Sequence, residues 1–495
     1  MTGRQRTTLV AAILGSAIAT IDGTVVNVAL PAIEQDLGGG LQAQQWVSNA
    51  YLLALGSLLL IGGSLGDIYG ERRVFAVGAG AFGVFSILCA LAPTSETLIA
   101  ARGLQGVAGA LLVPSSLAII VAAFPAGERA AAIGAWTAWG AIASLVGPLA
   151  GGLIVDRLSW RWIFAVNLPL VLLTLALVRA AVAPTTGRRG RRVDYVGAAL
   201  CALGLGGIVF ALIQQPRFGW SSPAILVPLV GGSAAFAAFL GHEHRTPEPM
   251  LRLELFSRRN FAVGNLETLA LYAGLAVAFF FLSIFLQQVA GYTALQAGLA
   301  TLPVTLAMFV LSRRFGALAD RLGPRLFMGA GPLVAAAGML LLLRTGLVTS
   351  YASDVLPALL VFALGLSMTV APLTAAVLAD ADETDAGIAS AINNAIARVA
   401  GLVGVSVVGL VAARALVGDT FAPNDASVRA FHEVVVICAA LLAGGGVAGA
   451  VGIANPRRPV HAEGCSGGQL YGVPEPAVAA RGSAAGVAAT VASEA

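Results

Sequence analysis

Fourteen apolar segments, each long enough to cross a bilayer, run through this 495-residue chain. A membrane-spanning helix needs about 20 largely apolar residues. Only 11% of the residues are charged, whereas soluble domains carry about 25%. A soluble fold of this length could not cover so much apolar surface, so the segments must face lipid. They lie near residues 8–30, 46–65, 74–93, 98–123, 131–155, 162–182, 193–214, 223–241, 261–289, 295–318, 325–343, 354–379, 386–413 and 431–453.

The distribution of arginine predicts how these spans are oriented. All 29 basic residues are arginine, and cytoplasmic loops of membrane proteins are enriched in basic residues. With a cytoplasmic N-terminus, 21 arginines fall on the cytoplasmic side and 6 outside, while Arg102 and Arg398 stay within spans. Removing one middle span would reverse every later loop and spoil this bias. We therefore expect a multi-pass protein of the bacterial inner (plasma) membrane with both termini in the cytoplasm.

Several function classes are excluded by what the sequence lacks. The arginines are scattered among loops, which argues against nucleic-acid binding. No Walker motif is present, so ATP is not expected as the energy source. No zinc-binding HExxH pair and no GxSxG elbow is present, so we expect neither an enzyme nor a cofactor. The cysteines show no metal-ligand or disulfide spacing: Cys89, Cys201, Cys438 and Cys465.

An internal repeat divides the chain. Residues 63–73 read Gly-Ser-Leu-Gly-Asp-Ile-Tyr-Gly-Glu-Arg-Arg, and residues 316–325 read Gly-Ala-Leu-Ala-Asp-Arg-Leu-Gly-Pro-Arg. Both copies close a span on the same side, so the two halves are parallel repeats. The copies begin 253 residues apart, which exceeds six spans by about the length of the two spans at 193–214 and 223–241. The predicted plan is six spans, two inserted spans and six more.

On this repeat and plan, the chain up to about residue 455 resembles the major facilitator superfamily, and within it the fourteen-span drug:proton antiporters. The resemblance implies an all-α integral membrane fold with two six-helix bundles and two inserted central helices. It divides the chain into a first bundle (1–182), a linker with two spans (183–260), a second bundle (261–454) and a disordered cytoplasmic tail (455–495).

The repeated loop is similar to the superfamily's signature between spans two and three. In the first copy, Gly63 and Gly70 allow close helix approach, and Asp67 can accept hydrogen bonds from a neighbouring helix N-terminus. Arg72 and Arg73 can lock the cytoplasmic face or bind lipid headgroups. In the second copy, the matching positions include Asp320 and Arg321. The alternative is a solvated basic loop.

Span five carries spaced small residues around a proline, and this pattern resembles the antiporter motif of exporters. The string contains Gly140, Gly147, Pro148, Gly151 and Gly152. Small residues four apart let helices touch backbone to backbone in lipid. A proline adds a kink whose freed carbonyl a neighbour must satisfy. Plain helix packing is the alternative interpretation.

Span one contains an embedded carboxylate in a string similar to the first-span signature of fourteen-span exporters. Asp22 lies inside this span, and an ionisable residue inside a membrane is a functional-site hypothesis by default. Arg102, in span four, falls at a similar depth in the outer half of the bilayer, so the two can share one network. We expect Asp22 to take up the coupling proton and Arg102 to tune it. A purely structural ion pair is the alternative.

The remaining polar residues inside spans have open roles. Asn27, Gln105, Asn393 and Asn394 are candidates for lining a substrate cavity, or they serve packing. Glu267, in span nine, is either a second proton or cation site or a side chain that reaches the cytoplasmic interface.

Together these features predict a proton-coupled efflux transporter that exports an amphipathic, drug- or antibiotic-like molecule by alternating access. The proton gradient is its expected energy source, and the bilayer, protons and the small molecule are its expected partners. A proton-coupled importer of a small nutrient on the same fold is the alternative, and the span-five glycines argue against it.

Overall fold

The computed structural model describes residues 1–183, 193–247, 249–379, 386–416 and 420–455. Within these residues, fourteen helices are long and apolar enough to cross a membrane, which confirms the predicted span count. A helix satisfies the backbone hydrogen bonds of its own segment, so it is the form an apolar chain takes in lipid. The predicted tail from residue 456 onward and the acidic residues at 380–385 lie outside the described residues.

The helices follow the predicted plan of six spans, two spans and six spans, and most continue past the ends of their apolar stretches. The first six spans comprise α1 (Gly3–Leu37), α2 (Gly40–Tyr69), α3 (Glu71–Ala90), α4 (Ser95–Ala123), α5 (Ala126–Arg157), and α6 (Trp162–Ala165) with α7 (Asn167–Ala181). The inserted pair is α8 (Tyr195–Phe218) and α9 (Pro223–Arg245). The last six spans comprise α10 (Arg259–Ile284) with η2 (Phe285–Val289), α11 (Ala294–Leu322), α12 (Pro324–Leu341) with η3 (Leu342–Arg344), η4 (Tyr351–Val355) with α13 (Leu356–Ala379), α14 (Ala386–Ala415) and α15 (Asp425–Gly452).

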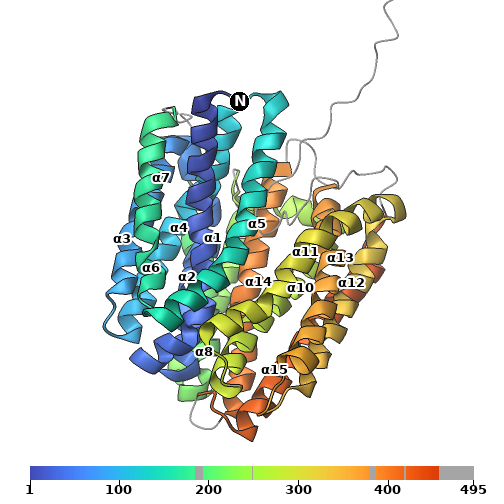
Figure 1. Cartoon of the computed structure of the whole chain (residues 1–495). Helices are drawn as coiled ribbons and strands as arrows, with labels where there is room; N and C mark the ends of the chain where they lie inside the picture. The colour runs from blue at the N-terminus through green and yellow to red at the C-terminus, as the bar shows by residue number, and fades with distance from the viewer. Residues whose placement is uncertain (184–192, 248, 380–385, 417–419, 456–495) are drawn as a thin grey trace, which may run out of the picture.

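The two six-span halves repeat the same packing pattern. Helix α1 contacts α5 and α7, and its counterpart α10 contacts α14 and α15. Likewise α4 packs on α2 and α3, as α13 packs on α11 and α12. Figure 1 shows the two bundles side by side, with α5 and α11 diverging toward the face that holds the N-terminus. That face is called the N-terminal face below, and the opposite one the far face.

Both copies of the repeated loop turn on a glycine with a positive backbone φ. Gly70 ends α2 at φ 90°, and Gly323 ends α11 at φ 87°. Each donates its backbone N–H to the carbonyl four residues earlier, at Gly66 and Ala319. Side chains disfavour this conformation, so glycine lets the next helix start immediately.

Replacing Gly70 with alanine is therefore expected to destabilise the fold by about 1–2 kcal/mol, the usual cost of a left-handed residue. The midpoint of thermal unfolding in detergent measures this loss. Gly80→Ala is the matched control because Gly80 lies within α3 and a Cβ there meets no atom within 4 Å. An equal loss in both variants would contradict the role of the turn.

Arginines at the N-terminal face cap the last helix of each half in the same way. Arg4, at the start of α1, donates from Nε to the carbonyl of Ala181 at 2.9 Å. Arg259, at the start of α10, donates from Nε to the carbonyl of Gly452 at 2.6 Å. Cations at a helix C-terminus satisfy free carbonyls and oppose the helix dipole. The sequence repeat is thus matched by a repeat of contacts.

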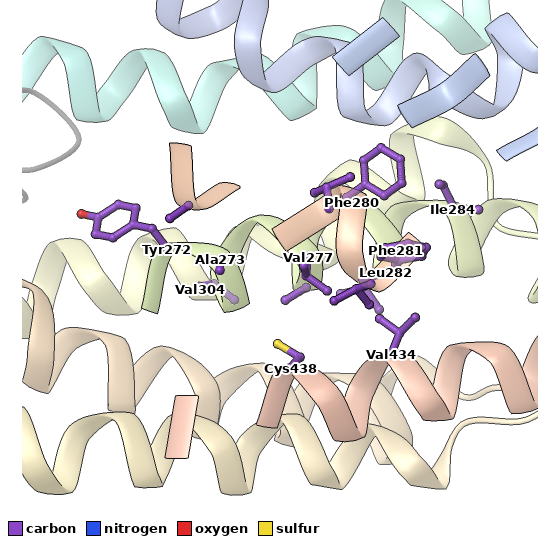
Figure 2. Close-up of a cluster of buried hydrophobic side chains, with 14 of the residues drawn as sticks. Tyr272, Ala273, Val277, Phe280, Phe281, Leu282, Ile284, Val304, Val434 and Cys438 are labelled. Carbon is purple, nitrogen blue, oxygen red and sulfur yellow. The ribbon is translucent and has the colours of Figure 1, made fainter. Parts of the chain in front are cut away.

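Aromatic and aliphatic side chains fill the second half around α10 (Figure 2). Phe281, Val277 and Leu282 of α10 are fully buried with Val434 and Cys438 of α15. Figure 2 shows these side chains between the two helices. Close packing of this kind, rather than hydrophobic exclusion, holds helices together in lipid.

Three helix pairs make the most extensive contacts between the two halves, and the inserted pair packs beside one of them. These pairs are α5 with α11, α2 with α14, and α1 with α10. Helix α8 contacts both α2 and α14, so it rests at their junction. Helices α8 and α9 approach each other backbone to backbone, because a Cβ on Gly207 would lie 2.9 Å from the Cα of Gly232.

Candidate functional site

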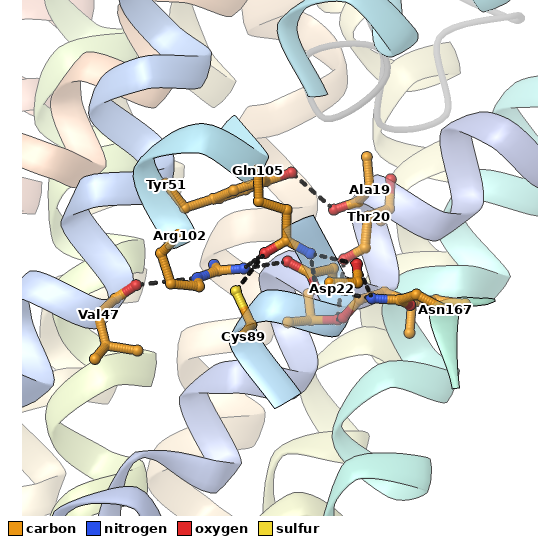
Figure 3. Close-up of polar contacts among 12 residues, drawn as sticks. Ala19, Thr20, Asp22, Val47, Tyr51, Cys89, Arg102, Gln105 and Asn167 are labelled. Atoms are coloured by element: carbon orange, nitrogen blue, oxygen red, sulfur yellow. Dashed lines mark hydrogen bonds and ion pairs between the residues drawn. The ribbon is translucent and has the colours of Figure 1, made fainter. Parts of the chain in front are cut away.

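Asp22 lies at the centre of a buried polar network inside the first half (Figure 3). Its Oδ2 forms an ion pair with Arg102, and neither side chain is more than 1% exposed. Its Oδ1 accepts hydrogen bonds from Gln105 Nε2 and Asn167 Nδ2, each at 3.0 Å. Ser86 Oγ accepts from the same two amides at 2.8 and 3.3 Å. The predicted proximity of Asp22 and Arg102 is confirmed.

Arg102 links this network to α2. Its Nε donates to the carbonyl of Val47 at 3.1 Å, and its Nη1 donates to Gln105 Oε1 at 2.6 Å. The guanidinium carbon lies 4.3 Å from the centre of the Tyr51 ring, a cation–π contact. Helices α1, α2, α3, α4 and α7 therefore all contribute to one site. Since arginine stays charged in proteins, Asp22 is the member of the pair that can gain or lose a proton.

The cavity candidates from the sequence occupy different places. Gln105 is fully buried within the Asp22 network. Asn393 is buried in the second half, where its Nδ2 donates to Asn265 Oδ1 and Thr268 Oγ1, both at 2.9 Å. Asn27 and Asn394 are half-buried. Gln105 and Asn393 thus join helices within one half.

Glu267 is fully buried in the second half, so it does not reach the surface. Among the described residues, neither of its carboxylate oxygens has a hydrogen-bond partner. The side chain lies against α15, where a Cβ on Gly449 would sit 2.5 Å from Glu267 Oε2. The small residue at 449 makes room for the carboxyl group. The structure does not bring Glu267 together with Asp22.

The span-five motif splits into two faces of α5. Gly147 and Gly151 face α1, because Cβ atoms there would lie 2.0 Å from Thr24 Oγ1 and 2.3 Å from a Val25 methyl. One residue further along, Pro148 and Gly152 face α11 of the other half. A Cβ on Gly152 would lie 2.5 Å from the Cα of Leu295. The motif is therefore a tight crossing between the two halves, and Gly140 is buried about two turns earlier in α5.

Asp156, one turn beyond this crossing, binds the start of α11. Its Oδ1 and Oδ2 accept hydrogen bonds from the backbone N–H groups of Ala294 and Leu295, both at 3.0 Å. An acceptor at a helix N-terminus satisfies free N–H groups and favours the helix dipole. Asp156 thus joins the first half to the second at the far face.

Asp156→Ala is expected to weaken closure of the far face by about 1–2 kcal/mol, a five- to thirtyfold change in population. The measurement is the rate at which a water-soluble maleimide labels a cysteine introduced at Ser283, which is 4% exposed at the α1–α10 junction. Labelling should accelerate. Glu96→Ala, at an exposed carboxylate of the same face, is the control, and unchanged labelling in Asp156→Ala contradicts the latch.

The two loop motifs lie at the N-terminal face. Asp67 and Asp320 are half-buried, whereas Arg73 and Arg321 are exposed. Arg72 donates from Nη2 to the carbonyl of Arg179 at 3.5 Å, near the end of α7. Gly63 lines a cavity at this face. This contact of Arg72 joins α3 to α7 within the first half.

Sequence reasoning missed several members of these sites. Asn167 and Ser86 complete the Asp22 network, and their signal was a polar side chain inside an apolar span. Gln45 and Asn49 of α2 join the halves, donating to Val405 O and Ser406 Oγ of α14 at 2.9 and 3.0 Å. Asp156 follows a recognisable motif, but its partners are backbone groups, which no side-chain pattern indicates.

The family model of the Major Facilitator Superfamily matches residues 12–405. The chain belongs to the major facilitator superfamily. Among relatives in this superfamily, the puromycin resistance protein pur8 of Streptomyces alboniger is 38% identical over 413 residues, covering 81% of both chains. The multidrug resistance protein Stp of Mycobacterium tuberculosis (strain CDC 1551 / Oshkosh) is 35% identical over 414 residues, covering 83% of this chain and 77% of that protein.

A solved structure shares the major facilitator fold at lower identity. A bacterial homolog of the human lysosomal transporter Spinster, in an inward-facing and unoccupied conformation, aligns with TM-score 0.66 and 14% identity. The alignment covers 91% of this chain and 97% of that one. As a member of this superfamily, the protein is a multi-pass membrane transporter and not an enzyme.

Proposed function

We propose that this transporter exports amphipathic, antibiotic-like small molecules in exchange for protons, with Asp22 as the proton carrier and alternating access as the mechanism. The observation that carries the proposal is a fully buried carboxylate paired with Arg102 in a bundle whose relatives are resistance and export proteins. Burying an ion pair costs desolvation free energy, and a well-packed apolar pair often stabilises a fold equally well. A role in proton exchange accounts for its presence.

The ion pair represents the deprotonated state of the site. When Asp22 gains a proton, the charge that holds Arg102 Nη1 disappears, and a buried cation without its partner is costly. Arg102 must then strengthen other contacts or move. Its remaining acceptors are Gln105 Oε1 and the carbonyl of Val47. Protonation is therefore expected to alter the position of α2.

Two short paths connect this event to the junctions between halves. Val47, whose carbonyl binds Arg102, lies between Gln45 and Asn49, which bind α14. Along α1, Asn27 is five residues from Asp22, about 7.5 Å, and its carbonyl accepts from Ser283 Oγ of α10 at 3.1 Å. A shift at the network thus acts on both contacts.

The hydrogen bonds that join the halves cluster toward the far face, at the Asp156, Gln45, Asn49 and Asn27 contacts. With the orientation predicted from the arginines, the far face is the outer side of the membrane. The halves are joined there, so the protein is in a state that opens toward the cytoplasm. A deprotonated Asp22 then coincides with the state that loads substrate from inside. Proton entry from outside, after the halves rock, resets the cycle.

The substrate class is inferred from the relatives, which include a puromycin resistance protein and a tetracenomycin C resistance and export protein. These molecules differ widely, which suggests apolar contact rather than a single rigid hydrogen-bond pattern. Glu267, buried without a partner among the described residues, is proposed as a second protonatable site because a neutral acid suits such surroundings.

Purified protein in liposomes tests the proposal. With an imposed proton gradient, puromycin uptake into inside-out vesicles should proceed together with proton efflux, and an uncoupler should abolish both. Movement of solute and proton in the same direction would support the importer instead. A rate of puromycin uptake that is the same with and without the proton gradient would refute proton coupling.

A further inference from the structure

A cavity of about 890 Å³ lies at the N-terminal face, among residues other than those of the Asp22 network. Its size falls within the range of drug-binding pockets, about 300–1,000 Å³. One helix from each half contributes, α2 through Leu60, Ser64 and Asp67 and α14 through Ile388 and Ala391. The inserted pair and the segment after it supply much of the remaining wall.

The wall of this cavity is rich in carboxylates. Asp67, Asp194, Glu243 and Glu254 line it, and Arg252 is the one arginine among the lining residues that the structure describes. Asp194 is already engaged, since its oxygens lie 2.9 and 3.0 Å from His242 Nε2 and Oδ1 accepts from the backbone of Gly197 at 2.8 Å. Among the described lining residues the carboxylates outnumber the arginine, and carboxylates attract cations.

Glu243 is the unusual member of this set. It is only 2% exposed, yet it lines the cavity. Its Oε2 accepts from the backbone of Leu251 at 2.9 Å, while its Oε1 has no hydrogen-bond partner among the described residues. Gly197 leaves room beside it, since a Cβ there would lie 2.8 Å from Glu243 Oε1 and 2.5 Å from Asp194 Oδ2. A buried carboxylate oxygen without a donor is costly.

We propose that this cavity binds the ammonium group of cationic amphipathic substrates, with Glu243 Oε1 as the acceptor. An alkylammonium supplies the missing donor and a positive charge, and Leu60, Met250 and Ile388 contact the apolar part. The inserted helix pair then builds a recognition site that a twelve-span plan would lack. This inference rests on the proposed export function and names one substrate class for it.

The test compares a cationic and a neutral dye in the same vesicles. Dansylcadaverine carries a primary alkylammonium group, and Nile red is lipophilic and neutral. Glu243→Gln should raise the KM for dansylcadaverine about tenfold, the effect of losing one charge-assisted hydrogen bond, and leave Nile red transport unchanged. Glu128→Gln, a carboxylate of the same face that does not line the cavity, should change neither. Ser64→Arg, which places a cation in the cavity, should reproduce the selective loss if Glu243→Gln does not fold.

An ammonium group is also present in phosphatidylethanolamine, so the transport is measured in phosphatidylglycerol vesicles with and without that lipid. A Glu243→Gln effect in the pure phosphatidylglycerol vesicles assigns the site to substrate. An effect confined to vesicles with phosphatidylethanolamine assigns it to lipid and overturns the proposal, as does equal loss for both dyes or no loss. If the wild type moves neither dye, the export function fails, and dansylcadaverine fluorescence on the purified protein still tests the site. Binding that is equal in wild type and Glu243→Gln then overturns it.

Discussion

Asp22→Asn is expected to abolish the ability of the transporter to build a substrate gradient. One proton crossing a potential of 100 mV supplies about 2.3 kcal/mol, which sustains a substrate ratio of about 45-fold. Asparagine matches the shape of aspartate and keeps an amide oxygen for Arg102, but it carries no exchangeable charge. The ratio reached by the variant in energised vesicles should therefore fall to about one, while downhill substrate exchange continues.

The control for this variant lies in the same helix. Asp36 also pairs with an arginine, Arg161, but its side chain is 45% exposed at the far face. Asp36→Asn should leave the gradient intact, because exposed ion pairs contribute little. Since Asp22→Asn leaves Arg102 buried and uncompensated, the double variant Asp22→Asn with Arg102→Gln keeps the site neutral if the single variant does not fold. A full substrate gradient in either Asp22 variant would refute the proton role.

Gly152→Ala is expected to hold the two halves apart at the far face. Its Cβ would lie 2.5 Å from the Cα of Leu295 and 2.7 Å from the carbonyl oxygen of Ala294, both backbone atoms that cannot rotate away. Overpacking of this kind costs about 1–3 kcal/mol, which lowers the closed population about 5- to 150-fold. Export should fall with it, because each cycle must close the far face.

Spin labels measure this separation directly. Cysteines introduced at Glu96 of α4 and at Val348, between η3 and η4, place one label on each half at the far face, in a chain without its native cysteines. Gly152→Ala should shift their distance distribution to longer values. Gly134→Ala is the matched control in the same helix, since a Cβ there meets nothing within 4 Å. An unchanged distribution in Gly152→Ala would contradict the proposed crossing.

Much of the fold was predictable because lipid imposes simple rules on sequence. The spans, their number and the repeat centred on Gly70 and Gly323 follow from apolar length and from two turns that only glycine adopts easily. The pairing of Asp22 with Arg102 was also predictable, because two charges at similar depth in apolar spans must compensate each other. The division into domains at residues 182, 260 and 454 stays a prediction.

Other features depend on how the helices face one another, which no sequence period encodes. Gln105 and Asn393 had two open roles in the sequence, cavity lining or packing, and the rotation of α4 and α14 places both in contacts within one half. The two faces of the span-five motif differ by a single residue, and only the crossing of α5 with α11 gives Pro148 and Gly152 a partner in the other half.

The sequence by itself determined the membrane setting, the span count, the internal repeat and the embedded charges. Each of these follows from composition and length along the chain. The tertiary structure decided which polar groups meet. It placed Asn167 beside Asp22, set Asp156 on the start of α11, and left Glu243 without a full set of partners at the edge of a cavity. The physical reason is that hydrogen bonds and close packing depend on the relative rotation and tilt of helices far apart in sequence.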